Sequence, residues 1–206
     1  ENMTRGPWVI SKVSKPFGRD AQMFDTSFGW RFVNPLMAKS YGTDGMGQTA
    51  ENLVELYKIS REDQDQFAYW SQMKASESQK NGRLNEEITS VTIPQRKKDA
   101  IVFKQDEFIK PNSTLEKLNS LRPAFKKENG SVTAGNASGL NDGAAALLLG
   151  NDQSAVKNHL KPLARIVSSA VAGVEPRIMG IGPVKASEKA LKRAGLTIND
   201  MDIIEL

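Results

Sequence analysis

The sequence predicts an α/β fold, and two observations indicate this class. Short apolar runs at residues 144–149, 163–171 and 202–206 alternate with helical patterns at residues 153–158 and 184–194. Strands that alternate with helices are typical of a layered α/β sheet. A hydrophobic fraction of 39% and a charged fraction of 25% are ordinary for a globular protein. The 206 residues suffice for one large domain or parts of two.

The first 44 residues carry no clear periodicity. Glycine and proline breakers separate aromatic residues that include Trp8, Phe17, Phe24 and Trp30. This pattern predicts an extended, loop-rich segment held in place by buried aromatic side chains.

Two helices are predicted next. The first begins after Thr49 as N-cap, and its apolar residues recur on one face: Ala50, Leu53, Val54 and Tyr57. The second opens with the S-x-x-D pattern of Ser60 and ends at Asn81-Gly82. Along it runs a stripe of small and polar residues suited to close packing: Ala68, Ser71, Gln72, Ala75 and Gln79. The acids at its start, which include Asp65, favour the helix dipole and need no catalytic explanation.

A hairpin and a short helix follow. Residues 88–93 and 101–104 are predicted strands, joined by a basic turn that is typical of a solvated hairpin tip but also fits a phosphate. Residues 114–118 are predicted to form a short helix that ends before Arg122-Pro123.

The sequence VTAGNASGLNDGAAALLLG, at residues 132–150, combines a small-residue loop with an apolar run. Small residues let the backbone approach a ligand or another segment closely, so both a packing loop and a ligand-binding loop fit. The apolar run at residues 144–149 has strand length, although a short helix also fits its alanines and leucines. A helix over residues 184–194 is predicted to stop at Gly195.

Composition narrows the function classes. The chain has no cysteine, which excludes a disulfide framework and a thiolate nucleophile within it. Its one histidine, His159, lies in a polar stretch that is typical of a surface position and leaves almost no room for a histidine metal site. A net charge of +4 suits an anionic ligand. We expect no membrane span and no nucleic-acid partner, because no apolar run approaches about 18 residues and no GxxxxGK[ST] loop is present.

Several motifs resemble those of thiolases, the enzymes that cleave or form 3-oxoacyl-CoA thioesters. The most specific is TAGNASGLNDGAAALLL in the glycine-rich segment. The others are ENMTR at the N-terminus, MGQTAEN at 46–52, SREDQD at 60–65, RPAF at 122–125 and MGIGP at 179–183. The segments FDT at 24–26, GWRFVNP at 29–35 and AGVEPR at 172–177 resemble those of bacterial 3-oxoadipyl-CoA thiolases of aromatic degradation.

The resemblance implies a fragment of the five-layered thiolase fold, internal to a longer protein. Residues 1–139 are expected to form the loop domain, a lid over CoA. Residues 140–160 are expected to complete the N-terminal thiolase domain, and residues 161–206 to begin the C-terminal one. The resemblance also implies coenzyme A as a substrate rather than a permanently bound cofactor. It further implies CoA thioesters as partners, a cytoplasmic location and a homodimer or homotetramer.

Family contacts to the reactive end of CoA carry over to four residues. Ser138 matches the serine that hydrogen-bonds the pantetheine amide, and Ala134 and Gly135 match the backbone beside it. Met46 matches a methionine that flanks the acyl group. Without the resemblance, Met46 also fits a core position and Ser138 a turn.

Family contacts to the rest of CoA carry over to three more residues. Leu121 and Phe125 match apolar contacts to the CoA arm, and Lys110 stands where the family has an arginine near the adenine nucleotide. These roles are chemically sound, because a pantetheine arm needs an apolar groove with a few polar groups and the phosphates need cations. Lys117 replaces a family serine in the same region, so no contact is assigned to it.

The sequence departs from the family at two kinds of position. Gly45 stands where thiolases of short acyl chains often have histidine, which favours a longer or dicarboxylic 3-oxoacyl chain. The catalytic cysteines and the GHP histidine have no counterpart, and the NEAF motif would fall after Leu206. We therefore expect this chain to supply CoA binding and to be inactive alone. A stand-alone, non-catalytic CoA-binding or regulatory module is the alternative.

Overall fold

The computed structural model describes residues 1–206, which form two compact units. One unit contains Glu1–Gly45 and Asp142–Leu206, and the other contains Met46–Asn141. No helix in the structure is both long enough and apolar enough to span a bilayer. The thiolase domain boundaries expected at residues 139 and 160 stay predictions.

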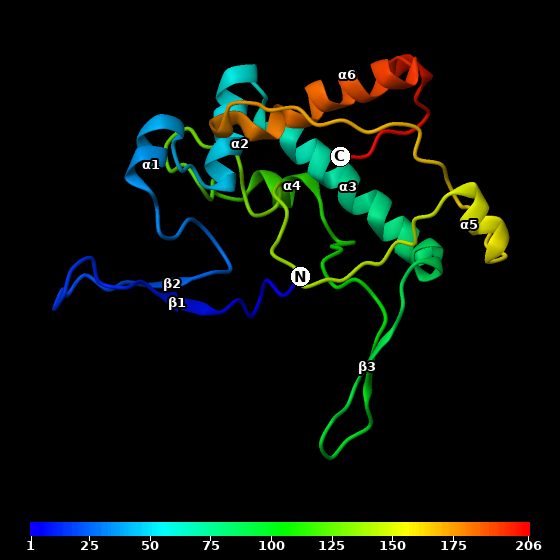
Figure 1. Cartoon of the computed structure of the whole chain (residues 1–206), viewed down its shortest axis with the longest axis horizontal. Coiled ribbons are helices and arrows are strands. Elements are labelled where there is room, and N and C mark those ends of the chain that lie inside the picture. The colour runs from blue at the N-terminus through cyan, green and yellow to red at the C-terminus, as the bar shows by residue number, and fades with distance from the viewer. The chain divides into compact units, whose positions relative to one another are not determined.

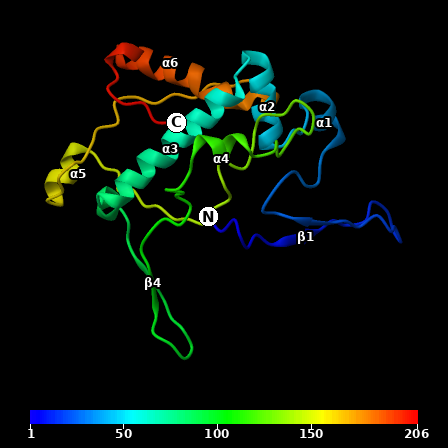
Figure 2. The ribbon, with the colours of Figure 1, turned by 180° about the vertical axis from the view of Figure 1, so that it is seen from behind.

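The Met46–Asn141 unit is built mainly of helices. Its elements are α2 (Met46–Tyr57), α3 (Arg61–Lys80), η1 (Arg83–Glu86), β3 (Val91–Ile93), β4 (Ile101–Phe103) and α4 (Leu115–Asn119). Figures 1 and 2 show α4 lying against α3, and the β3–β4 hairpin extending away from these helices.

Local signals set the ends of α3 correctly. The Ser60 hydroxyl accepts a hydrogen bond from the backbone N–H of Asp63 at 3.0 Å, so the predicted N-cap is confirmed. The helix ends at Lys80 with Asn81 as its C-cap, and Gly82 follows with a φ of 86°, a left-handed conformation that glycine adopts without strain. The predicted stop at Asn81-Gly82 is confirmed.

The start of α2 differs from the prediction. The helix begins at Met46, and Thr49 lies inside it rather than at the N-cap. The Thr49 hydroxyl donates to the carbonyl of Met46 at 2.8 Å, so it bonds back along the first turn and does not accept from a free N–H. The N-cap prediction at Thr49 is wrong.

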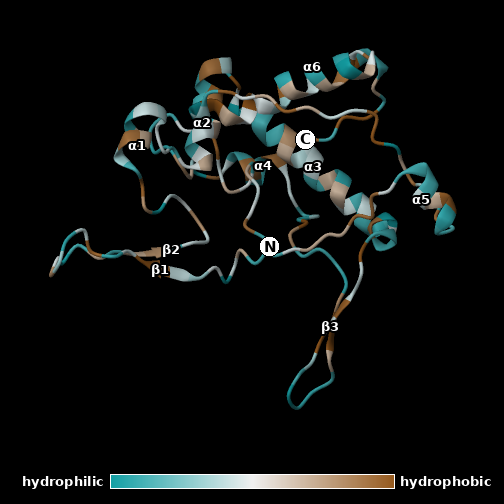
Figure 3. Ribbon diagram, in the orientation of Figure 1, coloured by the Kyte–Doolittle hydropathy of each residue, from teal (hydrophilic) through white to brown (hydrophobic).

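The predicted hairpin and short helix are both present. β3 and β4 pair antiparallel, with Thr92 opposite Val102. The turn between them is hydrophilic and the strands are hydrophobic (Figure 3). Thr114 caps α4 by accepting from the N–H of Lys117 at 3.2 Å.

The unit that contains both termini has small elements. They are β1 (Trp8–Ile10), β2 (Met23–Asp25), α1 (Pro35–Tyr41), α5 (Asp152–Lys157), η2 (Pro176–Ile181), α6 (Gly182–Ala194) and η3 (Ile198–Asp200). The predicted helices α5 and α6 are confirmed, and Gly195 ends α6 in the left-handed region as expected.

The first 44 residues contain more regular structure than the sequence suggested. β1 and β2 form an antiparallel hairpin, and α1 follows with Asn34 as its N-cap. Phe24 packs edge-on against Phe32, with ring centroids 5.2 Å apart. Trp8 and Phe17 are nevertheless exposed, so the prediction of a segment held by buried aromatic side chains is wrong. Backbone pairing between the two strands holds this segment instead.

The three apolar runs predicted as strands have no regular secondary structure. Residues 144–149, 163–171 and 202–206 pair with no other segment, and Leu147 and Leu148 are exposed. A strand is defined by hydrogen bonds to a neighbouring strand, and these runs find none within the chain. Part of the second run contacts α6 instead: the Ser168 hydroxyl donates to the carbonyl of Ala190 at 2.6 Å.

Candidate functional site

A buried carboxylate holds the start of the glycine-rich loop. Glu51 extends from α2 and is 2% exposed. Its carboxylate accepts the backbone N–H of Ser131 at 2.9 Å and that of Val132 at 2.8 Å. Bonds from N–H groups to an ionised acceptor are among the stronger hydrogen bonds in proteins. Glu51 therefore fixes the entry to the loop.

Side chains of the loop then stabilise its turn by accepting backbone hydrogen bonds. Asn136 accepts the backbone N–H of Thr133 at 2.7 Å through its side-chain oxygen. The Thr133 hydroxyl accepts the N–H groups of Gly135 and Asn136 at 3.1 and 3.3 Å. Threonine and asparagine side chains commonly stabilise tight turns in this way. Thr133 is fully buried, so the turn is part of the packed interior of the unit.

Gly135 is where the loop meets α4. A Cβ atom at this position would lie 2.5 Å from a methyl carbon of Leu121 and 2.6 Å from one of Leu118. Real Cβ atoms do not approach carbon this closely, so a larger residue would have to displace the two leucine side chains. The glycine brings the loop backbone against two leucine side chains.

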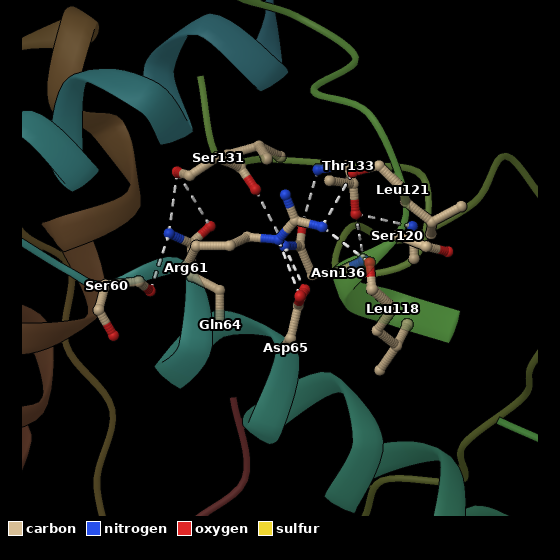
Figure 4. Close-up of polar contacts among 12 residues, drawn as sticks. Ser60, Arg61, Gln64, Asp65, Leu118, Ser120, Leu121, Ser131, Thr133 and Asn136 are labelled. Carbon is tan, nitrogen blue, oxygen red and sulfur yellow. Dashed lines mark hydrogen bonds and ion pairs between the residues drawn. The ribbon is translucent and has the colours of Figure 1, made fainter. Parts of the chain in front are cut away.

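An ion pair on α3 joins both sides of this contact (Figure 4). Arg61 Nε lies 2.8 Å from Asp65 Oδ2, and Asn136 Nδ2 donates to Asp65 Oδ1 at 2.9 Å. Arg61 Nη2 also donates to the carbonyl oxygens of Leu118 at 2.7 Å and Leu121 at 3.1 Å. Asp65 is fully buried. The interpretation of Asp65 as a residue that only favours the helix dipole is therefore incomplete, because its burial is caused by these tertiary contacts.

Two of the predicted CoA contacts line one hollow. A cavity of about 330 Å³ lies beside the start of α4, and Lys110 and Leu121 both face it. Its remaining lining residues are Pro111, Asn112, Ser113, Lys117 and Leu118. The backbone N–H of Lys110 donates to the Gln72 side chain at 2.7 Å, which ties this wall to α3.

The hollow carries positive charge. The Lys110 ammonium lies 5.6 Å from the centre of the Phe108 ring, within the range of a cation–π contact. Lys117 Nζ donates to the carbonyl of Asn112 at 2.8 Å. On the same helix, hydrogen bonds from its own N–H and from the Thr114 side chain lower the pKa of Glu116. The residues that line the hollow include two lysines and no carboxylate, so its lining is positively charged.

The other predicted contacts lie outside this hollow. Met46 is the exposed first residue of α2. The next residue, Gly47, is buried with its Cα against the ring of Phe125. Ala134 and Ser138 are exposed on the loop. The structure thus joins Lys110 to Leu121 and Leu121 to Gly135, whereas Phe125 lies beside the start of α2.

Sequence reasoning missed the residues that hold this arrangement, namely Arg61, Glu51 and Asp65. Both acids lie within motifs quoted above, MGQTAEN and SREDQD, but no role followed from the motifs themselves. His159 is exposed, as expected for a surface histidine.

Comparison with known proteins extends these observations. The family described as "Thiolase, N-terminal domain" matches residues 1–153, and the family described as "Thiolase, C-terminal domain" matches residues 160–206. The chain belongs to the thiolase family. It is 54% identical over all 206 residues to the 3-oxoadipyl-CoA/3-oxo-5,6-dehydrosuberyl-CoA thiolase of Escherichia coli, of which it covers 51%. It is 50% identical to a beta-ketoadipyl-CoA thiolase of Acinetobacter baylyi, with the same coverage.

A solved structure agrees with this assignment. The crystal structure of the Bacillus anthracis acetyl-CoA acetyltransferase matches with a TM-score of 0.85 and 42% identity. The match covers 98% of this chain and 50% of that one. The prediction of a partial thiolase fold is therefore confirmed, and the chain spans about half the length of the relatives it matches.

Proposed function

We propose that this chain is the CoA-binding part of a thiolase-type acyltransferase. In this proposal coenzyme A is a substrate, and the whole protein cleaves or forms 3-oxoacyl-CoA through a cysteine acyl-enzyme. The chain has no cysteine, so its own contribution is to bind and orient the thioester. We expect the chain alone to be catalytically inactive.

The observation that carries the proposal is the continuous set of contacts from Lys110 to the glycine-rich loop. Lys110 and Leu121 line one hollow, and Leu121 packs on Gly135. A thin amide chain such as pantetheine fits an apolar surface that ends in a few polar groups, with cations at the phosphate end. Leu121 supplies the apolar surface, Lys110 supplies a cation, and the exposed Ser138 offers a hydroxyl two residues after Asn136.

The reaction we propose for the whole protein proceeds in two steps. A thiolate attacks the 3-oxo carbonyl, the C2–C3 bond breaks, and acetyl-CoA leaves after protonation of its carbanion. The thiol of free CoA then takes the acyl group from the cysteine and regenerates the thiolate. Residues of this chain act on the CoA arm in both steps, because the same arm is carried by the thioester and by free CoA.

We propose a dicarboxylic 3-oxoacyl chain, of the 3-oxoadipyl type, as the substrate. Two relatives at 50% and 54% identity are named for beta-ketoadipyl-CoA and 3-oxoadipyl-CoA. Gly45, rather than histidine, precedes Met46 and supports a chain longer than acetoacetyl. A role in aromatic degradation, a cytoplasmic location and a homodimer or homotetramer belong to the same proposal.

The test is CoA binding by the 206-residue chain, measured by titration calorimetry. We expect weak but saturable binding, and no release of acetyl-CoA from a 3-oxoacyl-CoA. Replacing Ser138 by alanine should weaken binding about 2- to 12-fold, the range for one neutral hydrogen bond. Ser187→Ala, at an exposed position on α6, is the control and should change nothing.

Each outcome has a separate meaning. Absence of CoA binding in the unaltered chain would overturn the proposed function. Equal affinities for the unaltered chain and Ser138→Ala would remove only that serine from the site. Turnover of substrate by the isolated chain would contradict the expectation that the chain only binds.

A further inference from the structure

We propose that Arg61 and Asp65 are positioning residues of the CoA site, which fix the distance between the glycine-rich loop and α4. The proposal rests on the function proposed above and assigns it two residues that touch no ligand themselves. Its basis is that one buried ion pair on α3 contacts the backbone of one wall and a side chain of the other (Figure 4).

Arg61 holds the α4 wall. Its Nη2 donates to the carbonyl of Leu118, in the last turn of α4, and to that of Leu121, two residues after the helix. The Leu118 carbonyl also accepts the N–H of Leu121 at 3.1 Å, and a cation near the C-terminal end of a helix is favourable. The planar guanidinium donates to these two carbonyls and to Asp65 at the same time. A lysine has a single ammonium group and does not reproduce this forked arrangement of donors.

Asp65 holds the loop wall. One carboxylate oxygen accepts from Arg61 and the other from Asn136, at 2.8 and 2.9 Å. The same Asn136 amide donates to the carbonyl of Ser131 at 3.1 Å, and its oxygen accepts the N–H of Thr133. Asp65 therefore orients the residue around which the whole loop turns.

The two walls also touch each other directly. Leu118 and Leu121 pack on Gly135 without room for a Cβ atom. Leu121 thus belongs to the hollow, to the contact with the loop and to the Arg61 hydrogen bonds. A change at Arg61 should therefore alter the distance between the groups proposed to bind the CoA arm. The Arg61 side chain itself is about three-quarters buried.

The critical variant is Arg61→Lys, which keeps the charge and loses the fork. The control is Arg83→Lys, because Arg83 makes only exposed ion pairs with Glu86 and Glu87 beyond the other end of α3. CoA affinity is measured by calorimetry at a temperature where denaturation curves show each variant to be fully folded. We expect Arg61→Lys to lose about tenfold in affinity, within the range for residues that share one hydrogen-bond network. Arg83→Lys should keep its affinity.

A second variant separates positioning from stability. Asn136→Ala removes the loop end of the same connection, and the double variant Arg61→Lys with Asn136→Ala completes a cycle. If both residues act by fixing the distance between the loop and α4, the double variant should lose little more CoA affinity than the single variant that binds CoA more weakly. A purely structural role would lower the denaturation midpoint and leave the affinity of the folded protein unchanged.

The outcomes distinguish the two proposals. If the unaltered chain binds CoA and Arg61→Lys binds it with the same affinity, the positioning role alone is overturned. Strictly additive losses in the cycle would overturn it as well. No binding by the unaltered chain would overturn both this role and the function on which it rests.

Discussion

Glu51 offers the sharpest test of how the glycine-rich loop is held. Its carboxylate accepts two backbone N–H groups, from Ser131 and Val132, in a buried position. Both N–H groups donate to Oε1, at 2.9 and 2.8 Å, so glutamine keeps the shape and its one oxygen can keep both bonds. The acceptor nevertheless loses its charge, and an NH₂ group replaces Oε2, which lies 3.2 Å from the Ser131 nitrogen. Each of the two bonds then weakens by about 1 kcal/mol, because a neutral acceptor replaces a charged one.

The expected loss in free energy of unfolding is therefore about 2 kcal/mol, a substantial share of the 5–15 kcal/mol typical of a domain. The matched control lies one turn along α2. Glu55 makes an exposed ion pair with Lys126 at 3.4 Å, and such pairs contribute about 0–1 kcal/mol, so Glu55→Gln should be nearly neutral.

Two measurements test the expected destabilisation by Glu51→Gln. Urea denaturation followed by circular dichroism gives the change in unfolding free energy. Amide hydrogen exchange at residues 131 and 132 tests the local cause, because both N–H groups should exchange faster in Glu51→Gln and not in Glu55→Gln. Equal stability of Glu51→Gln and the unaltered chain would refute the reasoning. It would mean that removing a buried charge gains as much free energy as the weakening of the two hydrogen bonds costs.

Two further predictions concern other contacts. Gly135→Ala should cost about 1–3 kcal/mol by overpacking against the two leucines near α4, whereas Gly143→Ala, at a position with open space around it, should be neutral in the same urea assay. If Gly135→Ala is neutral too, the loop does not need glycine there. The Thr4 hydroxyl and backbone N–H donate to Asp142 and lower its pKa, so this contact should persist as pH falls from 7 through the ordinary carboxyl range and break only below it. NMR titration should give a pKa nearer the ordinary value in Thr4→Val, and an unchanged value would contradict the assignment.

Elements with strong local signals were predictable from sequence. Ser60 caps α3 and Gly195 ends α6 because the hydrogen bonds and backbone angles involved lie within a few residues of each other. The β3–β4 hairpin forms between segments only a short turn apart. Each of these features stabilises the same structure that the residues prefer locally, so no distant contact is needed to specify it.

The apolar runs show what local patterns leave open. Alternating strands and helices correctly indicated the α/β class, which the thiolase match supports, yet residues 144–149 and 163–171 form no strand within this chain. An apolar run predicts burial, but a strand also needs a neighbour to accept its backbone hydrogen bonds. Local composition therefore gives these runs a tendency to be buried, whereas a neighbouring strand decides whether they form a sheet.

The buried acids show a different limit. Asp63 and Asp65 both lie near the start of α3, and the helix dipole favours both, so charge alone does not distinguish them. Helical spacing does. Asp65 precedes Ala68, in the predicted packing stripe, by three residues and shares its face, whereas the exposed Asp63 bonds the Ser60 cap. An acid on a face expected to be buried needs partners. Its position therefore predicts a polar contact, although only the tertiary structure reveals that the contact is Asn136, 71 residues further along the chain.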